Sequence, residues 1–208
     1  MIMIHKYIAI FVPMIFVSCE NPADKTTDAK VSAAVEKAVA SVSAGTKYIF
    51  TPASRVGFVG SKITGSHAGG FKSFTGHFTI ADGVPVGNDH EVVIDMNSTF
   101  SDDEKLTSHL KSADFFDTEK FPKSTFNITG IEKQSEIAYV VSGNLTLHGE
   151  TKNISFPATV SENGDHVKID AKFDINRKDF GIVYAGKADD LIRDEVVIEL
   201  KLEAKPEA

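Results

Sequence analysis

From residue 48 onward, apolar and polar residues alternate along most of the chain. Apolar side chains recur at every second position in rows that run through 74–80, 92–96, 137–147, 167–175 and 196–202. A period of two is typical of antiparallel strands with one buried face and one hydrated face. Four turn signals separate the rows: Asp82-Gly83, Gly87-Asn88-Asp89, His148-Gly149 and Asn163-Gly164-Asp165. The pattern predicts an all-β chain.

One helix is predicted, over Asp102–Lys111, with Ser101 as its N-cap and Glu104 three residues later. Many strands and one short helix are compatible with a sandwich or a closed barrel. Gly76 and Gly143 lie in the middle of strand rows, and glycine there marks the tight bends of a barrel. We therefore expect an antiparallel barrel of about eight strands, a size that is filled by side chains or holds one small ligand.

The segment 109–126 breaks the alternation although it is rich in phenylalanine. Phe115, Phe116 and Phe121 stand among Asp, Glu, Lys and Pro residues, so they cannot form the inward face of a regular strand. The segment follows the helix and precedes the strand that contains Phe126, which predicts a connection at one end of the barrel. Three rings there either plug the barrel end or line the mouth of an apolar cavity.

Residues 1–18 have the pattern of an export signal. Lys6 precedes an apolar run over 7–17 that is too short to span a bilayer, which needs about 20 apolar residues. The end of the run, Phe16-Val17-Ser18-Cys19, resembles a bacterial lipoprotein signal, in which the cysteine becomes the lipid-modified first residue. The resemblance implies export to the periplasm and a membrane anchor at Cys19, and Glu20 favours the outer membrane. Ordinary signal cleavage nearby is the alternative.

Residues 19–46 predict a tether between this anchor and the barrel. The segment is rich in Ala, Lys, Ser, Thr and acidic residues, it contains no aromatic residue, and its apolar residues have helical spacing but are too small for a core. We expect mixed flexible and weakly helical character. The barrel domain then occupies 47–204, and 205–208 form a tail.

The composition excludes several classes of function. A net charge of −7 repels phosphate backbones, and basic clusters with interleaved aromatics are missing, so nucleic-acid binding is not expected. The single cysteine, Cys19, excludes a disulfide framework and a cysteine-based zinc site. The sequence has no metal-ligand spacing and no nucleophile elbow, P-loop or zinc-protease motif, so we expect no metal, no cofactor and no catalysis. A hydrolase built on His109 or His148 with a nearby acid is the enzymatic alternative.

Three motifs in order resemble those of the YceI-like family. They are "HLKSADFFDTEKFPKSTF" at 109–126, "GNLTLHGETKNISFPATV" at 143–160 and "FDINRKDFGI" at 173–182. The final strand, "DEVVIELKLEA", also resembles that of family members, whereas 105–108 lacks the Arg-Asp pair that many of them carry. The resemblance covers about residues 47–204. It implies a secreted, lipocalin-like eight-stranded barrel that holds a polyisoprenoid, a quinone-like molecule or a fatty amphiphile in an apolar tunnel.

The residues expected to contact such a ligand are phenylalanines. They are Phe74, Phe78, Phe115, Phe116, Phe121, Phe126 and Phe173. His109 and Arg177 are candidate contacts for a head group, although the helix dipole explains His109 and a salt bridge with an acid such as Asp179 explains Arg177 more simply. A barrel filled by its own side chains, acting as a structural or stress-related surface module, would lack a cavity. Pairing of two copies into a homodimer stays open.

Overall fold

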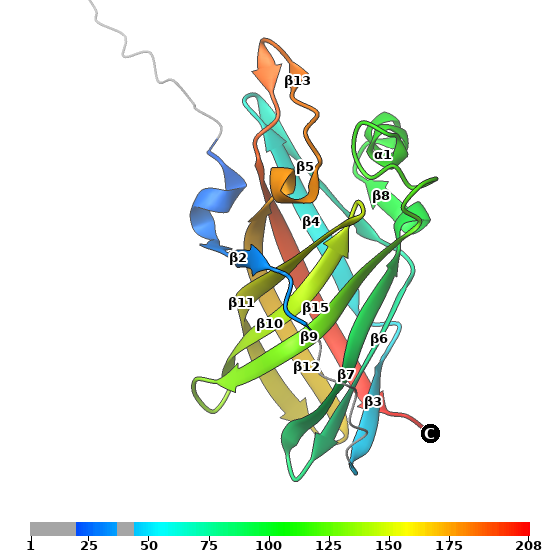
Figure 1. Cartoon of the computed structure of the whole chain (residues 1–208), viewed down its shortest axis with the longest axis vertical. Helices are drawn as coiled ribbons and strands as arrows, with labels where there is room; N and C mark the ends of the chain where they lie inside the picture. The colour runs from blue at the N-terminus through cyan, green and yellow to red at the C-terminus, as the bar shows by residue number, and fades with distance from the viewer. Residues whose placement is uncertain (1–19, 37–43) are drawn as a thin grey trace, which may run out of the picture.

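The structure, a computed structural model, describes residues 20–36 and 44–208. Its body is a closed, eight-stranded antiparallel barrel, which confirms the predicted lipocalin-like fold (Figure 1). The barrel strands are β3 (Thr46–Phe50), β6 (Phe74–Ala81), β7 (Val84–Asp95), β9 (Lys123–Lys133), β10 (Ala138–Leu147), β11 (Glu150–Asn163), β12 (His166–Asn176) and β15 (Glu195–Pro206). They pair with one another in chain order, and β15 closes the ring by pairing with both β12 and β3.

One end of the barrel, at the top of Figure 1, carries additional elements, and we call it the upper end. Strands β4 (Arg55–Lys62), β5 (Gly65–Phe71) and β8 (Thr99–Ser101) extend the wall from β15. Helix α1 (Glu104–Lys111) and the hairpin of β13 (Gly186–Lys187) and β14 (Asp190–Leu191) also lie there. Short 3₁₀ turns, η2 (Met96–Ser98) and η3 (Arg177–Phe180), follow β7 and β12.

The C-terminal strand is longer than predicted. Lys205 and Pro206, which were assigned to a tail at 205–208, pair with Ile49 and Tyr48 of β3. The extra pairs form because β3 is interrupted after Phe50, so the lower part of β15 needs β3 as its partner and the upper part uses β4. The tail of the described chain is correspondingly shorter.

Three of the four predicted turns are confirmed. Asp82-Gly83 and His148-Gly149 join consecutive strands with positive φ at both residues, and Asn163-Gly164-Asp165 joins β11 to β12. Such backbone angles suit glycine, aspartate and a few other residues. The fourth prediction is wrong, because Gly87-Asn88-Asp89 lies inside β7. The register of β6 against β7 shifts there, so the extra residues form a bulge instead of a separate turn.

Gly76 and Gly143 are needed where aromatic rings cross the barrel interior. A Cβ atom on Gly76 would lie 2.2 Å from the ring of Phe50, and one on Gly143 would lie 2.4 Å from the ring of Phe126. Both glycines also lie beside a register shift, as expected for bends in a barrel wall.

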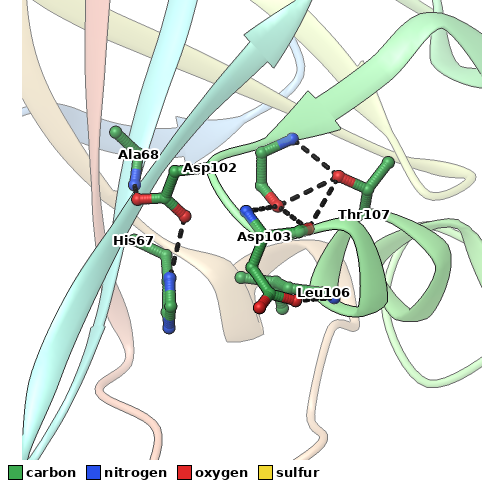
Figure 2. Close-up of polar contacts among 7 residues, drawn as sticks. His67, Ala68, Asp102, Asp103, Leu106 and Thr107 are labelled. Carbon is green, nitrogen blue, oxygen red and sulfur yellow. Dashed lines mark hydrogen bonds and ion pairs between the residues drawn. The ribbon is translucent and has the colours of Figure 1, made fainter.

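Helix α1 begins two residues later than predicted, at Glu104. Its N-cap is Asp103, whose carboxylate accepts a hydrogen bond from the Leu106 N–H at 2.7 Å and so satisfies a free amide of the first turn (Figure 2). Ser101, the predicted cap, instead donates its hydroxyl to the Asp103 carbonyl at 2.7 Å. Within the described residues, no helix is long and apolar enough to cross a membrane.

Asp102 ties the start of this helix to β5. Its carboxylate lies 2.8 Å from Nδ1 of His67 and accepts a hydrogen bond from the Ala68 N–H at 3.0 Å (Figure 2). These two contacts, the Ala68 amide first, lower the pKa of the Asp102 carboxyl.

The described part of the predicted tether lies on the barrel wall. It contains a 3₁₀ turn, η1 (Pro22–Lys25), a strand β1 (Thr27–Asp28) that pairs in parallel with β12, and a strand β2 (Lys30–Ala33) that pairs antiparallel with β11 (Figure 1). The prediction of flexible and weakly helical character is wrong here, because the backbone groups of β11 and β12 stabilise an extended segment. Residues 1–19, with the signal and Cys19, and residues 37–43 lie outside the described chain.

Candidate functional site

The barrel encloses two adjoining apolar cavities. The upper chamber, beneath α1 and the loop that follows it, has a volume of about 190 Å³, and the lower chamber has a volume of about 120 Å³. Side chains that line both chambers are Val92, Phe126, Phe156, Leu200 and Leu202. Protein interiors contain few voids larger than one water molecule, so these volumes favour a ligand site over a barrel filled by its own side chains.

The lining of the upper chamber is almost entirely apolar because the inward positions of the strands are apolar. Among the described residues, its polar side chains are those of Ser124, Arg177 and Arg193. Ser124 is buried, and its hydroxyl donates to the Thr146 carbonyl at 2.7 Å. A ligand in this space is therefore held by apolar contact and shape.

The consecutive rings of Phe115 and Phe116 belong to one hydrophobic cluster at the top of the upper chamber. Phe115 is buried and packs edge-on against His109, with 5.0 Å between ring centres. Phe116 packs against Phe58 at 6.2 Å and Phe71 at 6.1 Å. Both rings line the chamber, so the irregular segment is at once a plug for the barrel end and a wall of the cavity.

Five of the seven predicted phenylalanines line the chambers. Phe115, Phe116, Phe126 and Phe173 line the upper chamber, and Phe78 and Phe126 line the lower one. Contact of these rings with a ligand stays a prediction.

Phe74 and Phe121 lie outside both linings. Phe74 packs against Phe50 at 6.5 Å in a groove on the wall. Phe121 packs on His148 at 4.8 Å. The chain turns back at Asp117, which has a positive φ and accepts a hydrogen bond from the Phe121 N–H, so Phe121 faces the β10–β11 turn and not the cavity.

Three phenylalanines of the upper chamber were not predicted. They are Phe58, Phe71 and Phe156. The parity of β11 identifies Phe156, because Ile154 and Phe156 share the inward face. Phe71 and Phe58 belong to glycine-rich strands with weak alternation, so nothing in the sequence marks them.

A polar vestibule of about 620 Å³ adjoins the upper chamber. Its lining combines apolar side chains with polar and charged ones, namely Ser61, Lys62, His67, Asp103, Lys105, His109, Tyr184, Lys187 and Asp190. The residues that line both spaces are Phe58, Gly60, Leu110, Phe115 and Ile192. His109 therefore lies at the vestibule and not in the chamber, with its Nε2 atom 2.8 Å from the Asp114 carboxylate.

The buried Arg177 side chain acts as a clamp, in that it hydrogen-bonds both ends of the loop above the upper chamber. Its guanidinium donates hydrogen bonds to the carbonyls of Ile182 at 2.7 Å, Arg193 at 3.0 Å and Ile192 at 3.4 Å. It also forms an ion pair with Asp194 at 3.2 Å, so the expected pairing with Asp179 is wrong. Burial lowers the pKa of Arg177, and the Asp194 carboxylate opposes this shift. A head group would compete with these acceptors.

A buried carboxylate lies where β1 joins the wall. Asp174 is 3% exposed and accepts a hydrogen bond from the Thr26 hydroxyl at 2.5 Å. Burial raises the pKa of the Asp174 carboxyl; the Thr26 bond opposes this rise, and the nearby Asp28 and Glu195 add to it. The folded chain therefore binds a proton here more tightly than the unfolded chain.

We expect this group to make the chain less stable as the pH rises. The contribution of Asp174 to stability is fully present below its ordinary pKa of 3.8 and is lost as the pH passes through its raised folded value. Asp174→Asn should remove that loss and raise the free energy of unfolding at neutral pH. Urea unfolding of both chains across this pH range measures the difference, with Asp170→Asn, an exposed site on the same strand, as control. Equal pH slopes for the natural chain and Asp174→Asn would contradict the expectation.

The described residues contain no group of three or more His, Cys, Asp or Glu side chains that could hold a metal ion.

Comparison with known proteins agrees with this architecture. The model of the YceI-like domain matches residues 48–204. A UPF0312 protein of Pseudomonas putida strain W619 is 31% identical over 137 residues, which cover 63% of this chain and 71% of that protein. The protein YceI of Salmonella arizonae is 34% identical over 120 residues, which cover 55% of this chain and 62% of that protein.

Two solved structures share the fold. BcnA of Burkholderia cenocepacia has a TM-score of 0.65 at 26% identity, covering 73% of this chain and 96% of BcnA. A polyisoprenoid-binding domain of Saccharophagus degradans, implicated in plant cell wall breakdown, has a TM-score of 0.65 at 18% identity, covering 78% of this chain and 99% of that domain. With the family match over the whole barrel, these likenesses lead to one conclusion: the chain belongs to the YceI-like family.

Proposed function

We propose that this protein binds one long-chain amphiphile, namely a polyisoprenoid, a quinone-like molecule or a fatty compound, inside the barrel and carries or stores it without chemistry. The observation that carries the proposal is the pair of adjoining apolar chambers along the barrel interior. The Saccharophagus degradans domain, which is named for polyisoprenoid binding and shares the fold, supports it.

Apolar burial is the main source of affinity for such a ligand. Each buried methylene contributes about 0.8 kcal/mol, so about ten of them match the roughly 8 kcal/mol of micromolar binding, before ordering costs are subtracted. The lining offers rings and branched aliphatic side chains and few polar partners. The site therefore selects for an apolar chain and tolerates variation in its exact length.

The head group belongs in the vestibule at the upper end. The lining of this space contains basic and acidic side chains together, namely Lys62, Lys105, Lys187, Asp103 and Asp190. The His109 ring also lines the vestibule. A polar group there stays hydrated while the chain is buried below. Arg177 acts in this arrangement by holding the loop of the upper chamber.

The export pattern at the N-terminus supports a periplasmic location. A lipid on Cys19 would anchor the barrel to a membrane, the outer one in preference, through the following segment. The protein would then take an apolar molecule from a membrane or a partner and shield it from water.

Mass spectrometry of organic extracts tests the proposal. The full chain, expressed with export and purified, should release one class of long-chain species in near-stoichiometric amount. After delipidation it should take up an added ubiquinone or polyprenol and release it chemically unchanged. A folded chain that yields no lipid and takes up neither compound would overturn the proposal.

A further inference from the structure

The barrel wall is split between β11 and β12. The ladder that joins these strands at the lower end stops at the pair Thr159–Asp170. Above it, β11 pairs with β2 and β12 pairs with β1. Residues 27–33, which we name the strap, therefore fill the split as one short extended segment. Within it, the Ala29 N–H donates a hydrogen bond to the Asp174 carbonyl at 2.9 Å.

The upper chamber lies behind this strap. Phe156 of β11 and Phe173 of β12 stack across the split, with ring centres 4.0 Å apart and planes 8° from parallel. Both rings line the upper chamber, and Ala29 is buried in the same cluster. One strand and two rings thus separate the chamber from the outside.

The split continues below the strap as a groove on the outer surface. The groove has a volume of about 630 Å³, and its lining includes the buried Ala158 and Ala171, which lie two positions from Phe156 and Phe173 on β11 and β12. Small side chains at this position leave the wall thin at the lower end of the split.

Backbone pairing with β11 and β12 holds the strap, and side-chain hydrogen bonds of Thr26 with Asp174 and of Asn144 with the Val35 backbone flank it, but few apolar side chains contribute. Its side chains in the core cluster are Ala29 and Val31, which have little apolar surface. Asp28 lies beside the buried Asp174 and contributes to the raised pKa of that carboxyl, so docking places a carboxyl group of the strap next to one of β12. Segments with few buried apolar contacts open locally at lower free energy than the core.

We infer that the strap is a displaceable part of the wall and that the split beneath it is the lateral port through which the apolar chain of the ligand enters and leaves the upper chamber. This inference rests on the proposed function. The upper end is narrowed by Phe115 and Phe116 under α1, so a chain that entered from that side would have to pass charged side chains of the vestibule and two packed rings. Sideways entry needs only the strap and the Phe156–Phe173 pair to move apart.

A disulfide across the split tests the port. Lys30 of the strap is the register partner of Ser155 on β11, and Cys19→Ser removes the single natural thiol. In the full chain with Lys30→Cys, Ser155→Cys and Cys19→Ser, oxidation should slow uptake and release of parinaric acid, a fluorescent fatty acid, by about tenfold or more, because the strap must open locally. Reduction should restore both rates, and the equilibrium affinity should stay the same.

The matched control crosslinks β11 on its other side. Thr146→Cys with Thr151→Cys joins register partners of β10 and β11 and leaves the split free, so oxidation should not change the rates. Equal exchange rates in the oxidised and reduced strap variant would overturn the port. Failure of both forms, and of the natural chain, to bind the probe would instead overturn the proposed function.

A second pair of variants needs no crosslink. Val31→Asp places a charge on the inward face of the strap and should accelerate probe release, whereas Ser32→Asp places it on the exposed face and should leave release unchanged. Equal release rates for the two variants would also contradict the port.

Discussion

Replacing Arg177 with alanine is expected to lower the free energy of unfolding by about 3 kcal/mol or more, since several buried acceptors lose their donor together. Three carbonyls of the loop that covers the upper chamber and the carboxylate of Asp194 would remain without the guanidinium. Asp194 keeps its contact with Lys178, so most of the loss falls on the carbonyls. Urea unfolding measures the effect.

Arg55→Ala is the matched control for this prediction. Arg55 also donates to two backbone carbonyls, those of Pro52 and Ser54, but its side chain is exposed. We expect its loss to cost no more than about 1 kcal/mol, because water replaces the guanidinium. Similar destabilisation by the two substitutions would show that the Arg177 clamp is not a special feature of the fold.

Gly60→Phe is expected to reduce ligand affinity by at least about tenfold, or 1.4 kcal/mol, without unfolding the barrel. Gly60 lies on β4 and lines both the upper chamber and the vestibule. A Cβ atom built on Gly60 has no neighbouring atom within 4 Å, so a ring at this position would occupy the space of the ligand. Phenylalanine is also preferred over glycine in strands, which favours folding.

Gly65→Phe serves as its control. Gly65 also has open space around its Cβ position, but it lies at the start of β5, outside both chamber linings. Titration with a fluorescent fatty acid should show wild-type affinity for this variant and weak binding for Gly60→Phe, with equal thermal midpoints for both. Undiminished binding by a folded Gly60→Phe chain would place the ligand outside the upper chamber.

Much of the barrel could be predicted from the sequence because its strands carry one apolar face each. The predicted strands that contain Phe78, Phe126 and Phe173 all form wall strands of the barrel. Local signals also identified three turns and the helix. The alternation could not reveal the bulge at Gly87-Asn88-Asp89, since a bulge and a turn use the same residue types.

The site was only partly predictable because cavity walls depend on contacts between distant segments. The segment around Phe115 showed that rings gather at a barrel end, but not that Phe121 turns away from the cavity. The strap was missed for a different reason: a short, weakly apolar strand has no stable structure until β11 and β12 offer their edges. The partner of Arg177 likewise follows from the loop that brings Asp194 beside it.

The pairing of β15 with three strands governs how the chain folds. Its upper half joins β12 to β4, and its last residues meet β3, which begins the barrel. The ring therefore cannot close until β15 is free to pair with β12 and β3. Until then β12, β3 and β4 have open edges, which are sites of aggregation. Such closure between the two ends of a chain folds slowly, so loss of the last few residues would affect folding yield before any ligand is bound.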